Sequence, residues 1–408
     1  MITRRKLLKI LSGLPFAGLI AGGLAGSGAA GAIEKLNKAS NYRDFYKELG
    51  LRTFINAQGT WTYLTGSLMR PEVMDAINYA SRQYVNFNEL QDVVGRRLAE
   101  MGKSEDAMVT AGAASALTLG TAACITGTDE EKIRLLPNLP GPQREVIVQS
   151  SHRFAYDHAV RNTGIRLVEV ESTQELENAV NENTVMMLFL NYANYNGQIQ
   201  WEEFVELGKK HGIPTFNDCA ADLPPVENLW KFNEMGFDLV TFSGGKGLRG
   251  PQSAGLLFGR KDLIEAAKLQ HVPHADTIGR GMKVNKEEII GMMVAVEEFL
   301  KQDHEKKHGE FHERVRLIGQ HASQVPGVST EIFVPDIGNH TPTLRVTWDQ
   351  DKVDLTPQKV QEKLRNGHPS IEVLATSDFI RISMWMARAG EEKVVARRLQ
   401  EVLKSGVV

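Results

Sequence analysis

The chain has 408 residues, of which 42% are hydrophobic and 24% are charged, a composition typical of globular proteins and unlike that of disordered chains. The formal net charge of −3 leaves no basic excess, so we expect no nucleic-acid partner. The two cysteines, Cys124 and Cys219, are too few for a disulfide framework, and no His/Cys cluster has metal-ligand spacing, so no metal site is predicted.

Residues 1–32 resemble a twin-arginine export signal. Arg4 and Arg5 precede a leucine pair and a lysine, and an apolar run rich in glycine and alanine follows. Ala30-Gly31-Ala32 fits a small-residue cleavage site, which would place the start of the mature chain at Ile33. We therefore expect a periplasmic or otherwise exported protein that engages the twin-arginine export machinery. The alternative is a signal that remains attached as a membrane anchor.

The first segments of the mature chain lead into a glycine-bearing turn. Residues 41–54 are predicted to form an arm or a short helix. The polar stretch 53–60 follows a short strand, and it either lines a site or is a plain loop. Helices are predicted at 71–84, with Pro71 in the first turn, and at 90–101.

A cluster of small residues opens the next helix. A short strand at 107–110 precedes Gly112, Ala113 and Ala114, and the apolar helix continues to residue 125. Small side chains let backbone N–H groups approach an anion, and the dipole of a helix N-terminus favours negative charge there. We interpret this helix start as a phosphate cradle; the alternative is close packing of a small-residue helix.

Strands alternate with helices from residue 107 to residue 259, which predicts an α/β fold with a mostly parallel sheet and right-handed crossovers. His152 and Asp218 each follow the end of a strand, where open α/β sheets place their sites. The ring of His152 can stack on an aromatic cofactor, or it can be an ordinary core histidine. Asp218 can pair with a pyridinium nitrogen, or it can cap the next helix.

Lys246 lies on a glycine-rich turn between two apolar strands, predicted at 237–242 and 253–258. The turn begins with Ser243, Gly244 and Gly245. A partly desolvated lysine loses its proton more easily, which suits an amine that forms a Schiff base with a carbonyl cofactor. The alternative is a solvated surface lysine in an ordinary hairpin.

The pattern changes after residue 264. A long helix is predicted from residue 287 to about 320, and the strands and helices that follow predict a small α+β domain. Arg381 lies within an apolar strand, where it can clamp a substrate carboxylate or form an internal ion pair. The predicted division is a signal at 1–32, an arm and large cofactor-binding domain at 33–285, and a bridging helix with a small domain at 286–408.

Several blocks of the sequence resemble fold-type I pyridoxal-phosphate enzymes. The pattern Ser243-x-x-Lys246-x-x-x-Gly250-Pro251 resembles the lysine motif of class V aminotransferases. The blocks FSGGKGLRGPQSAGLLFGRKDLIEAA, HRFAYDHAVRNTGIRLVEV and IGRGMKVNKEEIIG resemble the selenocysteine-synthase-like branch, and within it the relatives of D-glucosaminate-6-phosphate ammonia-lyase. The resemblance spans about residues 41–390.

The resemblance implies that pyridoxal 5′-phosphate is the cofactor and assigns roles to single residues. Lys246 would be the Schiff-base lysine, Asp218 the partner of the pyridinium nitrogen and His152 the ring-stacking residue. The positions that match the phosphate cradle are Gly112, Ala113, Ala114 and Ser243. Arg381 loosely matches an arginine that binds the substrate carboxylate. Arg280 lies in a block whose basic residues would reach the site, either within the same chain or from a neighbouring subunit. Members of the family are homo-oligomers, so we expect at least a dimer.

The implied function is an exported pyridoxal-phosphate lyase that acts on an amino acid or an amino sugar acid. The reaction would run through an α-carbanion to α,β-elimination with release of ammonia. An aminotransferase or a racemase would use the same carbanion, and a non-catalytic binding protein could keep the same fold. No extra tRNA-binding domain is recognised, so selenium transfer to a tRNA is not expected. The export signal separates the chain from cytoplasmic lyases, so a phosphorylated sugar acid taken up by a transport system is not the expected substrate.

Overall fold

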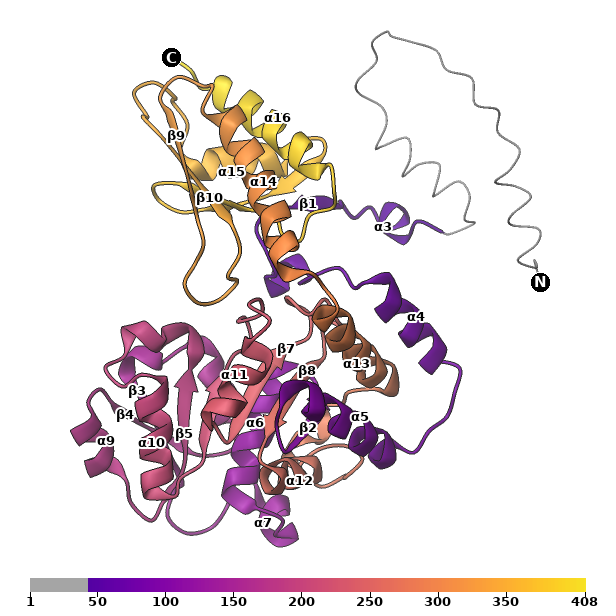
Figure 1. Ribbon diagram of the computed structural model, residues 1–408, viewed down its shortest axis with the longest axis vertical. Helices are drawn as coiled ribbons and strands as arrows, with labels where there is room; N and C mark the ends of the chain where they lie inside the picture. Colours follow the sequence, from indigo (N-terminus) through magenta and orange to yellow (C-terminus); the bar gives the residue numbers. More distant parts are fainter. Residues whose placement is uncertain (1–42) are drawn as a thin grey trace. The chain divides into compact units, whose positions relative to one another are not determined.

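The structure is a computed structural model that describes residues 43–408, and its largest sheet is formed by seven strands (Figure 1). The strand order is β2-β8-β7-β6-β5-β3-β4. These strands are β2 (Asp106–Thr110), β3 (Glu145–Gln149), β4 (Arg166–Val170), β5 (Thr184–Leu190), β6 (Thr215–Asp218), β7 (Leu239–Ser243) and β8 (Gly255–Gly259). From β7 to β4 the neighbouring strands are parallel, whereas β8 runs antiparallel to both of its neighbours. The predicted α/β fold with a mostly parallel sheet is confirmed.

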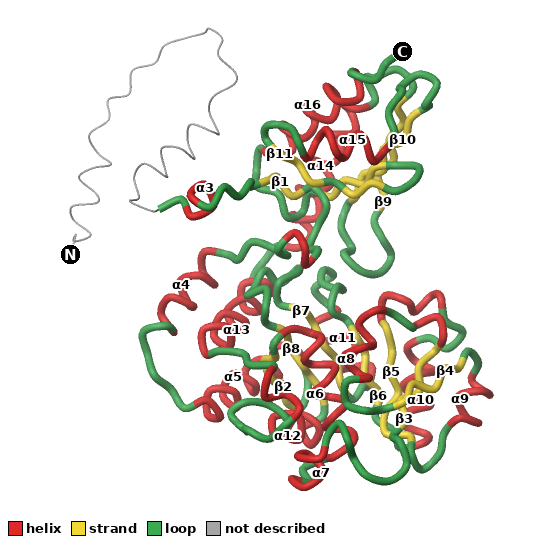
Figure 2. Tube along the Cα trace, turned by 180° about the vertical axis from the view of Figure 1, so that it is seen from behind, coloured by secondary structure: helices red, strands yellow, loops and turns green. Residues whose placement is uncertain are grey.

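Helices cover both faces of this sheet (Figures 1 and 2), because its buried strands carry apolar side chains on both sides. Ile147 packs into one hydrophobic cluster, and its neighbours Val146 and Val148 pack into the other. The helices of this part of the chain are α4 (Pro71–Ala80), α5 (Phe87–Gly102), α6 (Gly112–Thr126), α7 (Glu130–Leu135), α8 (His158–Arg161), α9 (Thr173–Ala179), α10 (Trp201–His211), α11 (Asn228–Met235), α12 (Lys261–Leu269) and α13 (Lys286–Leu300). A capping box formed by Ser172 and Glu175 begins α9.

A second, antiparallel sheet is formed by the C-terminal strands in the order β12-β13-β10-β9. Its elements are β9 (Val328–Phe333), β10 (Thr343–Trp348), β12 (Leu374–Ala375) and β13 (Ile380–Ser383), together with α14 (His304–Ala322), α15 (Pro357–Arg365) and α16 (Glu391–Lys404). β1 (Phe54–Asn56) pairs in parallel with β11 (Ser370–Glu372), so an early segment of the chain joins the C-terminal layer.

The prediction of one long helix from residue 287 to about 320 is wrong, because this stretch forms two helices. α13 ends at Leu300, and α14 begins at His304 after a cap. The Asp303 side chain accepts a hydrogen bond from the Lys306 N–H at 2.9 Å, which satisfies a free donor at the start of α14. α13 packs on α4 and α5, so contacts cross residue 286, and the predicted domain division stays a prediction.

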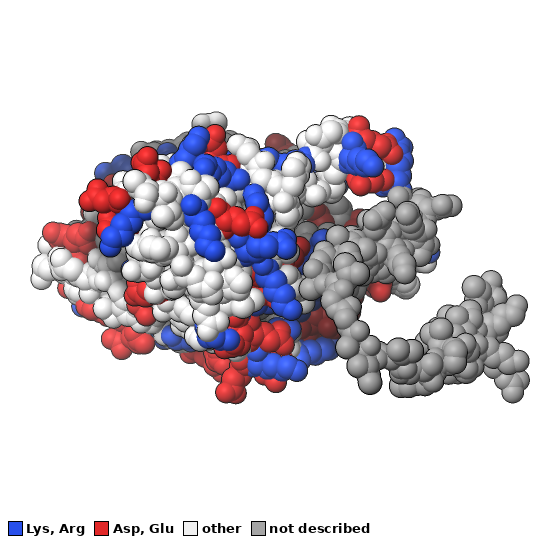
Figure 3. All heavy atoms as spheres, turned by 90° about the horizontal axis from the view of Figure 1, so that it is seen from above, with Lys and Arg blue, Asp and Glu red and all other residues white. Residues whose placement is uncertain are grey.

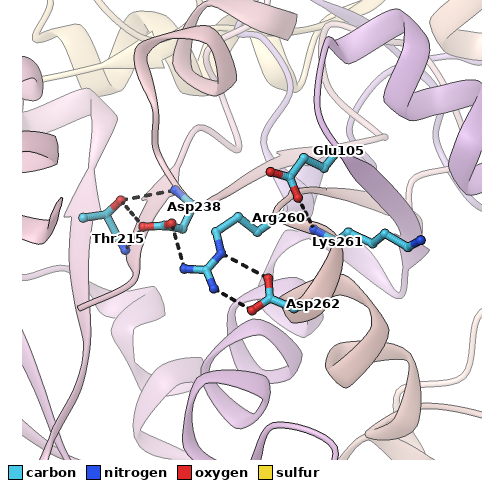
Figure 4. A network of polar contacts seen from close by, with 6 residues as sticks. All are labelled: Glu105, Thr215, Asp238, Arg260, Lys261 and Asp262. Atoms are coloured by element: carbon cyan, nitrogen blue, oxygen red, sulfur yellow. Dashed lines mark hydrogen bonds and ion pairs between the residues drawn. The ribbon is translucent and has the colours of Figure 1, made fainter. Parts of the chain in front are cut away.

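A polar network fixes the edge of the large sheet at which β6 and β7 begin (Figure 4). The Asp238 carboxylate accepts hydrogen bonds from the Thr215 N–H at 2.8 Å and from its hydroxyl at 3.0 Å. The Arg260 guanidinium lies 3.2 Å from Asp238 and also binds Asp262. This network lies at the start of β7, and the functional turn follows the end of the same strand.

Residues 43–53 form a separate short unit that contains α3 (Phe45–Glu48), capped by the Asp44 side chain. The twin-arginine segment predicted at residues 1–32 lies outside the described residues. Within residues 43–408, no helix is long and apolar enough to cross a membrane, and no cluster of ligating side chains suits a metal ion. Both cysteines are free thiols. Acidic and basic side chains are interspersed over the face drawn in Figure 3.

Candidate active site

The turn that carries Lys246 is a tight structure that follows β7. The Gly250 N–H donates to the Gly244 carbonyl at 2.9 Å, and the Arg249 N–H donates to the Lys246 carbonyl at 3.0 Å. A Cβ atom at Gly247 would lie 2.1 Å from the carbonyl oxygen of Leu223, so only glycine fits there. The turn therefore holds Lys246 on a rigid base, as its glycine content predicts.

Asp218 lies at the end of β6, next to the strand that leads to Lys246. It pairs in register with Thr241 of β7 and is 5% exposed. Burial raises the pKa of the Asp218 carboxyl, while a hydrogen bond from the Ala220 N–H at 2.9 Å and the charge of Lys246 act in the opposite direction. Burial also lowers the pKa of the Lys246 ammonium, although Asp218 and Asp222 partly oppose this shift. The lysine amine and the two carboxyl groups therefore influence one another electrostatically.

Asp222 is a functional candidate that the sequence analysis missed. It is 2% exposed, and its Oδ1 atom has no hydrogen-bond partner among the described residues. Burial raises the pKa of Asp222 to about 7, and the neighbouring Asp218 charge adds to the effect, whereas the Asn191 side chain and the charge of Lys246 oppose it. Its position four residues after a strand-end aspartate was the available signal. Near neutral pH this carboxyl can therefore exchange a proton.

Lys246, Asp218 and Asp222 line one cavity of about 410 Å³. Gln58, Gly59 and Thr60 form part of its wall, so the turn at 53–60 lines a site. The remaining lining residues come from segments far apart in the sequence: Trp61, Thr62, Phe154, Ala155, Tyr156, Leu190, Tyr192, Ala220, Ala221, Pro335, Gly338, Asn339, Thr343, Arg381, Ser383 and Trp385. The volume suits a ligand or cofactor of small-molecule size.

The predicted phosphate-cradle positions converge beside this cavity, although they are not among its lining residues. Ser243 of β7 pairs with Gly255 of β8, which in turn pairs with Thr110 of β2, just before the start of α6. A Cβ atom at Gly255 would lie 2.7 Å from the Ala113 nitrogen, so the strand and the helix start are in close contact. No side chain caps the N-terminus of α6, so its first N–H groups remain available for an anion.

His152, the residue to which the resemblance assigns ring stacking, lies just beyond the end of β3. It is fully buried and does not line the cavity, and its Nδ1 atom accepts a hydrogen bond from the Leu190 N–H at 3.2 Å. Its ring packs edge-on against Phe189, with centroids 4.4 Å apart, and burial lowers the pKa of His152 to about 4. Its predicted ring-stacking role stays a prediction. Phe154, two residues later, is the aromatic residue that lines the cavity.

The two predicted substrate arginines have different surroundings. Arg381 of β13 lines the cavity, and no carboxylate in the described part of the chain forms an ion pair with it. Burial lowers the pKa of the Arg381 guanidinium, and the internal ion pair that was the alternative is not seen. Arg280 is exposed on a short 3₁₀ helix, Ile278–Gly281, and lines neither this cavity nor a second one beside it. Its predicted role stays a prediction.

The chain is similar in sequence to a protein family and to individual members of it. A family model described as SelA, L-seryl-tRNA selenium transferase, matches residues 54–328. A 5′-C-glycyluridine monooxygenase-decarboxylase from Streptomyces sp is 31% identical over 376 residues, which cover 88% of this chain and 92% of that protein. A D-glucosaminate-6-phosphate ammonia lyase from Salmonella typhimurium (strain 14028s / SGSC 2262) is 30% identical over 339 residues, which cover 80% and 88% of the two chains.

Solved structures with the same fold agree with the sequence comparisons. The structure of a D-glucosaminate-6-phosphate ammonia-lyase superposes with a TM-score of 0.78 at 27% identity, covering 89% of this chain and 99% of that one. A NifS-like protein superposes with a TM-score of 0.58 at 15% identity, covering 86% and 100%. At that lower identity the likeness extends to the fold alone.

Proposed function

Because the chain belongs to the L-seryl-tRNA selenium transferase (SelA) family and is a pyridoxal-phosphate enzyme of fold type I, we propose that it is a lyase that releases ammonia from an amino sugar acid or an amino acid. One observation carries this proposal. The Lys246 amine shares a cavity with two buried carboxyl groups, Asp218 and Asp222. The similarity to an ammonia lyase over 80% of the chain supports it.

The residues present fit pyridoxal phosphate. Lys246 offers a half-buried amine for the aldehyde, and Asp218 offers a carboxylate for the ring nitrogen. The uncapped N-terminus of α6 and the Ser243 hydroxyl would hold the phosphate group. When bound, the cofactor supplies an aldehyde that captures the substrate amine and a ring that accepts negative charge from the α-carbon.

Lys246 is the group that would take the proton from the α-carbon of the substrate. A lysine acts as a base only when its amine is neutral, and burial lowers the pKa of Lys246 toward that state. The glycine-rich turn limits the positions that the amine can reach, so proton transfer is confined to the cavity. These two properties make Lys246 the catalytic base in this proposal.

Elimination also needs a proton for the departing β-hydroxyl group, which leaves as water. Asp222 can supply it, because burial raises the pKa of this carboxyl to about 7 and part of it is protonated at neutral pH. Arg381, on the wall of the same cavity, can bind the substrate carboxylate bidentately. The remaining enamine would hydrolyse to a keto acid and ammonia.

Replacing Lys246 with alanine tests the proposal. In the Lys246→Ala variant we expect the visible absorbance of bound cofactor to change and turnover to fall by at least a thousandfold, because covalent attachment and the base are both lost. Lys261→Ala is the matched control, since Lys261 is exposed at the start of α12. Borohydride reduction followed by peptide mass analysis would locate the cofactor on Lys246 in the wild type. Normal turnover in Lys246→Ala would exclude the assigned role.

Product analysis separates the lyase from the other outcomes of the same carbanion. A keto acid with free ammonia supports elimination, whereas an enantiomer or a transferred amine would indicate a racemase or an aminotransferase. A purified protein that takes up no pyridoxal phosphate would favour the non-catalytic alternative.

Export and assembly complete the proposal. The arginine pair Arg4 and Arg5 supports export through the twin-arginine route to the periplasm. A homo-oligomer of at least two copies is supported by exposed apolar side chains that gather between residues 61 and 84, among them Tyr63, Tyr79 and Tyr84.

A further inference from the structure

A second cavity, of about 510 Å³, adjoins the catalytic one. Trp385 lines both cavities. At two places, consecutive residues line different cavities. Lys246 and Asn339 line the first cavity, and the residues that follow them, Gly247 and His340, line the second. Trp385 and these neighbouring residues therefore place the two cavities side by side.

Three arginines of the second cavity have no carboxylate partner in an ion pair among residues 43–408. The Nε atom of Arg70 is buried and has no hydrogen-bond partner in the described part of the chain. Arg249 donates from Nε to the Leu68 carbonyl at 2.9 Å, and Arg314 donates to the carbonyls of Met384 and Ala387 at 3.2 and 2.8 Å. Because these acceptors are neutral, the three positive charges are not balanced by direct contacts.

The carboxylates around this cavity leave a positive balance. Five arginine and lysine side chains line it, against three glutamates. Lys301 is paired with Glu298 at 2.6 Å and Lys307 with Glu310 at 2.8 Å. Glu298 and Glu72 partly offset the field at Arg70, and Glu72 does so at Arg249. The pKa of Arg70 is still lowered to about 10, first by burial and then by repulsion from Arg249. An anion between these two guanidinium groups would counteract their mutual repulsion and would stabilise the charge of the buried Arg70.

The backbone at Arg249 adopts an unfavourable conformation. Its φ angle is +56°, in the left-handed region that side chains other than glycine and asparagine seldom adopt. The same turn that holds Lys246 fixes this geometry through the hydrogen bond from the Arg249 N–H to the Lys246 carbonyl. One rigid turn thus presents an amine to the catalytic cavity and a guanidinium to the second one.

We propose that Arg70 and Arg249 bind an oxyanion of the phosphate class in the second cavity, with Arg314 adding to the positive field. The favoured source of this anion is a phosphate group on the substrate, at the end far from the amine that reaches Lys246. This choice rests on the proposed function. The other source of the same chemistry is a free phosphate that acts as an effector. Guanidinium groups suit either, since their paired donors match the oxygens of a phosphate.

Calorimetric titration of the holoenzyme with inorganic phosphate, at constant ionic strength and with excess pyridoxal phosphate, tests the site. We expect the wild type to bind phosphate, and Arg70→Gln and Arg249→Gln to bind it about tenfold or more weakly. Arg316→Gln is the control, because Arg316 is a partly exposed arginine paired with Glu313 on α14 and lines neither cavity. Thermal unfolding in the same buffers shows whether each variant is folded.

Two results would overturn the proposal: no phosphate binding by the wild type, or equal affinities in wild type, Arg70→Gln and Arg249→Gln. The visible spectrum of the same samples reports the cofactor separately. A colourless protein that still binds phosphate through Arg70 would refute the proposed function while leaving the anion site intact.

The two sources are distinguished by a matched pair of probes, D-glucosaminate 6-phosphate and D-glucosaminate. If the anion is part of the substrate, the phosphorylated probe binds more tightly, inorganic phosphate competes with it, and Arg70→Gln abolishes the difference. If the anion is an effector, inorganic phosphate binds without displacing either probe. Both results support an oxyanion site at Arg70 and Arg249.

Discussion

Asp222 shows how burial can change the chemistry of a single side chain. A carboxyl group on the surface is ionised well below neutral pH, but Asp222 is 2% exposed and lies close to a second acid, Asp218. Its folded-state pKa of about 7 lies above that of the unfolded chain, so the folded state holds a proton that the unfolded state has already lost. The contribution of Asp222 to stability is therefore complete at low pH and is lost as the pH rises toward 7.

We predict that Asp222→Asn removes this pH dependence. Between pH 5 and pH 8 the wild-type free energy of unfolding should fall by about 3 kcal/mol more than that of Asp222→Asn, because asparagine cannot ionise. Urea unfolding of the cofactor-free protein at the two pH values measures the difference. Asp351→Asn, a change in an exposed turn, should behave like the wild type. Parallel profiles for wild type and Asp222→Asn would show that Asp222 ionises normally.

His152 makes a related point about neighbouring residues. The backbone at Gly197 packs directly against the ring of His152, since a Cβ atom at Gly197 would lie 2.8 Å from the Nε2 atom of the histidine. The histidine ring is held by this contact, by Phe189 and by the Leu190 N–H. A residue just after a strand end can thus turn into the core, while Phe154, two residues later, lines the cavity.

At the scale of elements, two helix glycines with opposite surroundings test the packing. A Cβ atom at Gly95 of α5 would lie 2.2 Å from the Ala107 carbonyl of β2, whereas one at Gly309 of α14 would meet nothing within 4 Å. α5 therefore packs against β2 at a distance that only glycine permits. α14 has no such constraint at residue 309.

We predict that Gly309→Ala raises the free energy of unfolding by about 0.5–1 kcal/mol, because alanine is the better helix former. Gly95→Ala should lower it by about 1–3 kcal/mol despite the same gain in helix propensity, because the backbone of α5 or β2 must shift. Denaturant unfolding of the two variants beside the wild type measures both changes. A stabilised Gly95→Ala protein would contradict the close approach of α5 and β2.

The turn from residue 244 to residue 250 is the element on which both proposed sites depend. It places Lys246 in one cavity and Arg249 in the next, and the close approach of Gly247 to Leu223 fixes its position. A single rigid turn can therefore keep the reacting amine and the anion-binding group at a constant separation. Substrate length would then be selected by the protein backbone.

At the scale of the whole molecule, the catalytic cavity is assembled from segments that are far apart in the sequence. Gln58, Lys246 and Arg381 all line it, and the pairing of β1 with β11 brings the first of these segments to the C-terminal layer. Contacts between such distant segments form only when the whole chain folds. The site is therefore expected to appear with global folding, as one unit.

Assembly is predicted from the surface of the stretch 61–84. Tyr79 is 70% exposed and Tyr84 is fully exposed, which is unusual for large aromatic side chains on a monomer. The full chain has a mass of 45.3 kDa, and cleavage of the predicted signal peptide would reduce it. Light scattering of the purified protein should give at least twice the mass of the single chain. The double variant Tyr79→Ser, Tyr84→Ser should shift the population toward smaller species. A monomeric wild type at micromolar concentration would exclude the predicted oligomer.

Export is predicted from the arginine pair and the apolar run that follows it. Replacing Arg4 and Arg5 with lysine keeps the charge and removes the feature that the export machinery is expected to read. Cell fractionation should find the wild type in the periplasm and the variant in the cytoplasm. An unchanged distribution would show that the first residues are not a twin-arginine signal.

The sequence by itself determined the α/β sheet, the positions of most helices, the glycine-rich lysine turn and the strand-end aspartate. Each of these follows from local rules: the repeat of apolar residues, capping residues such as Ser172, and glycines such as Gly247 that a tight turn requires. Such rules involve residues close in the chain, so a single sequence carries them.

Only the tertiary structure decided which side chains face the cavities. It placed Asp222 in the wall and His152 in the core, divided the predicted long helix at Asp303, and brought Arg70 beside Arg249. Burial and electrostatic coupling depend on contacts between segments separated by tens to hundreds of residues. These contacts follow from the packing of the whole chain, and no local pattern in the sequence encodes them.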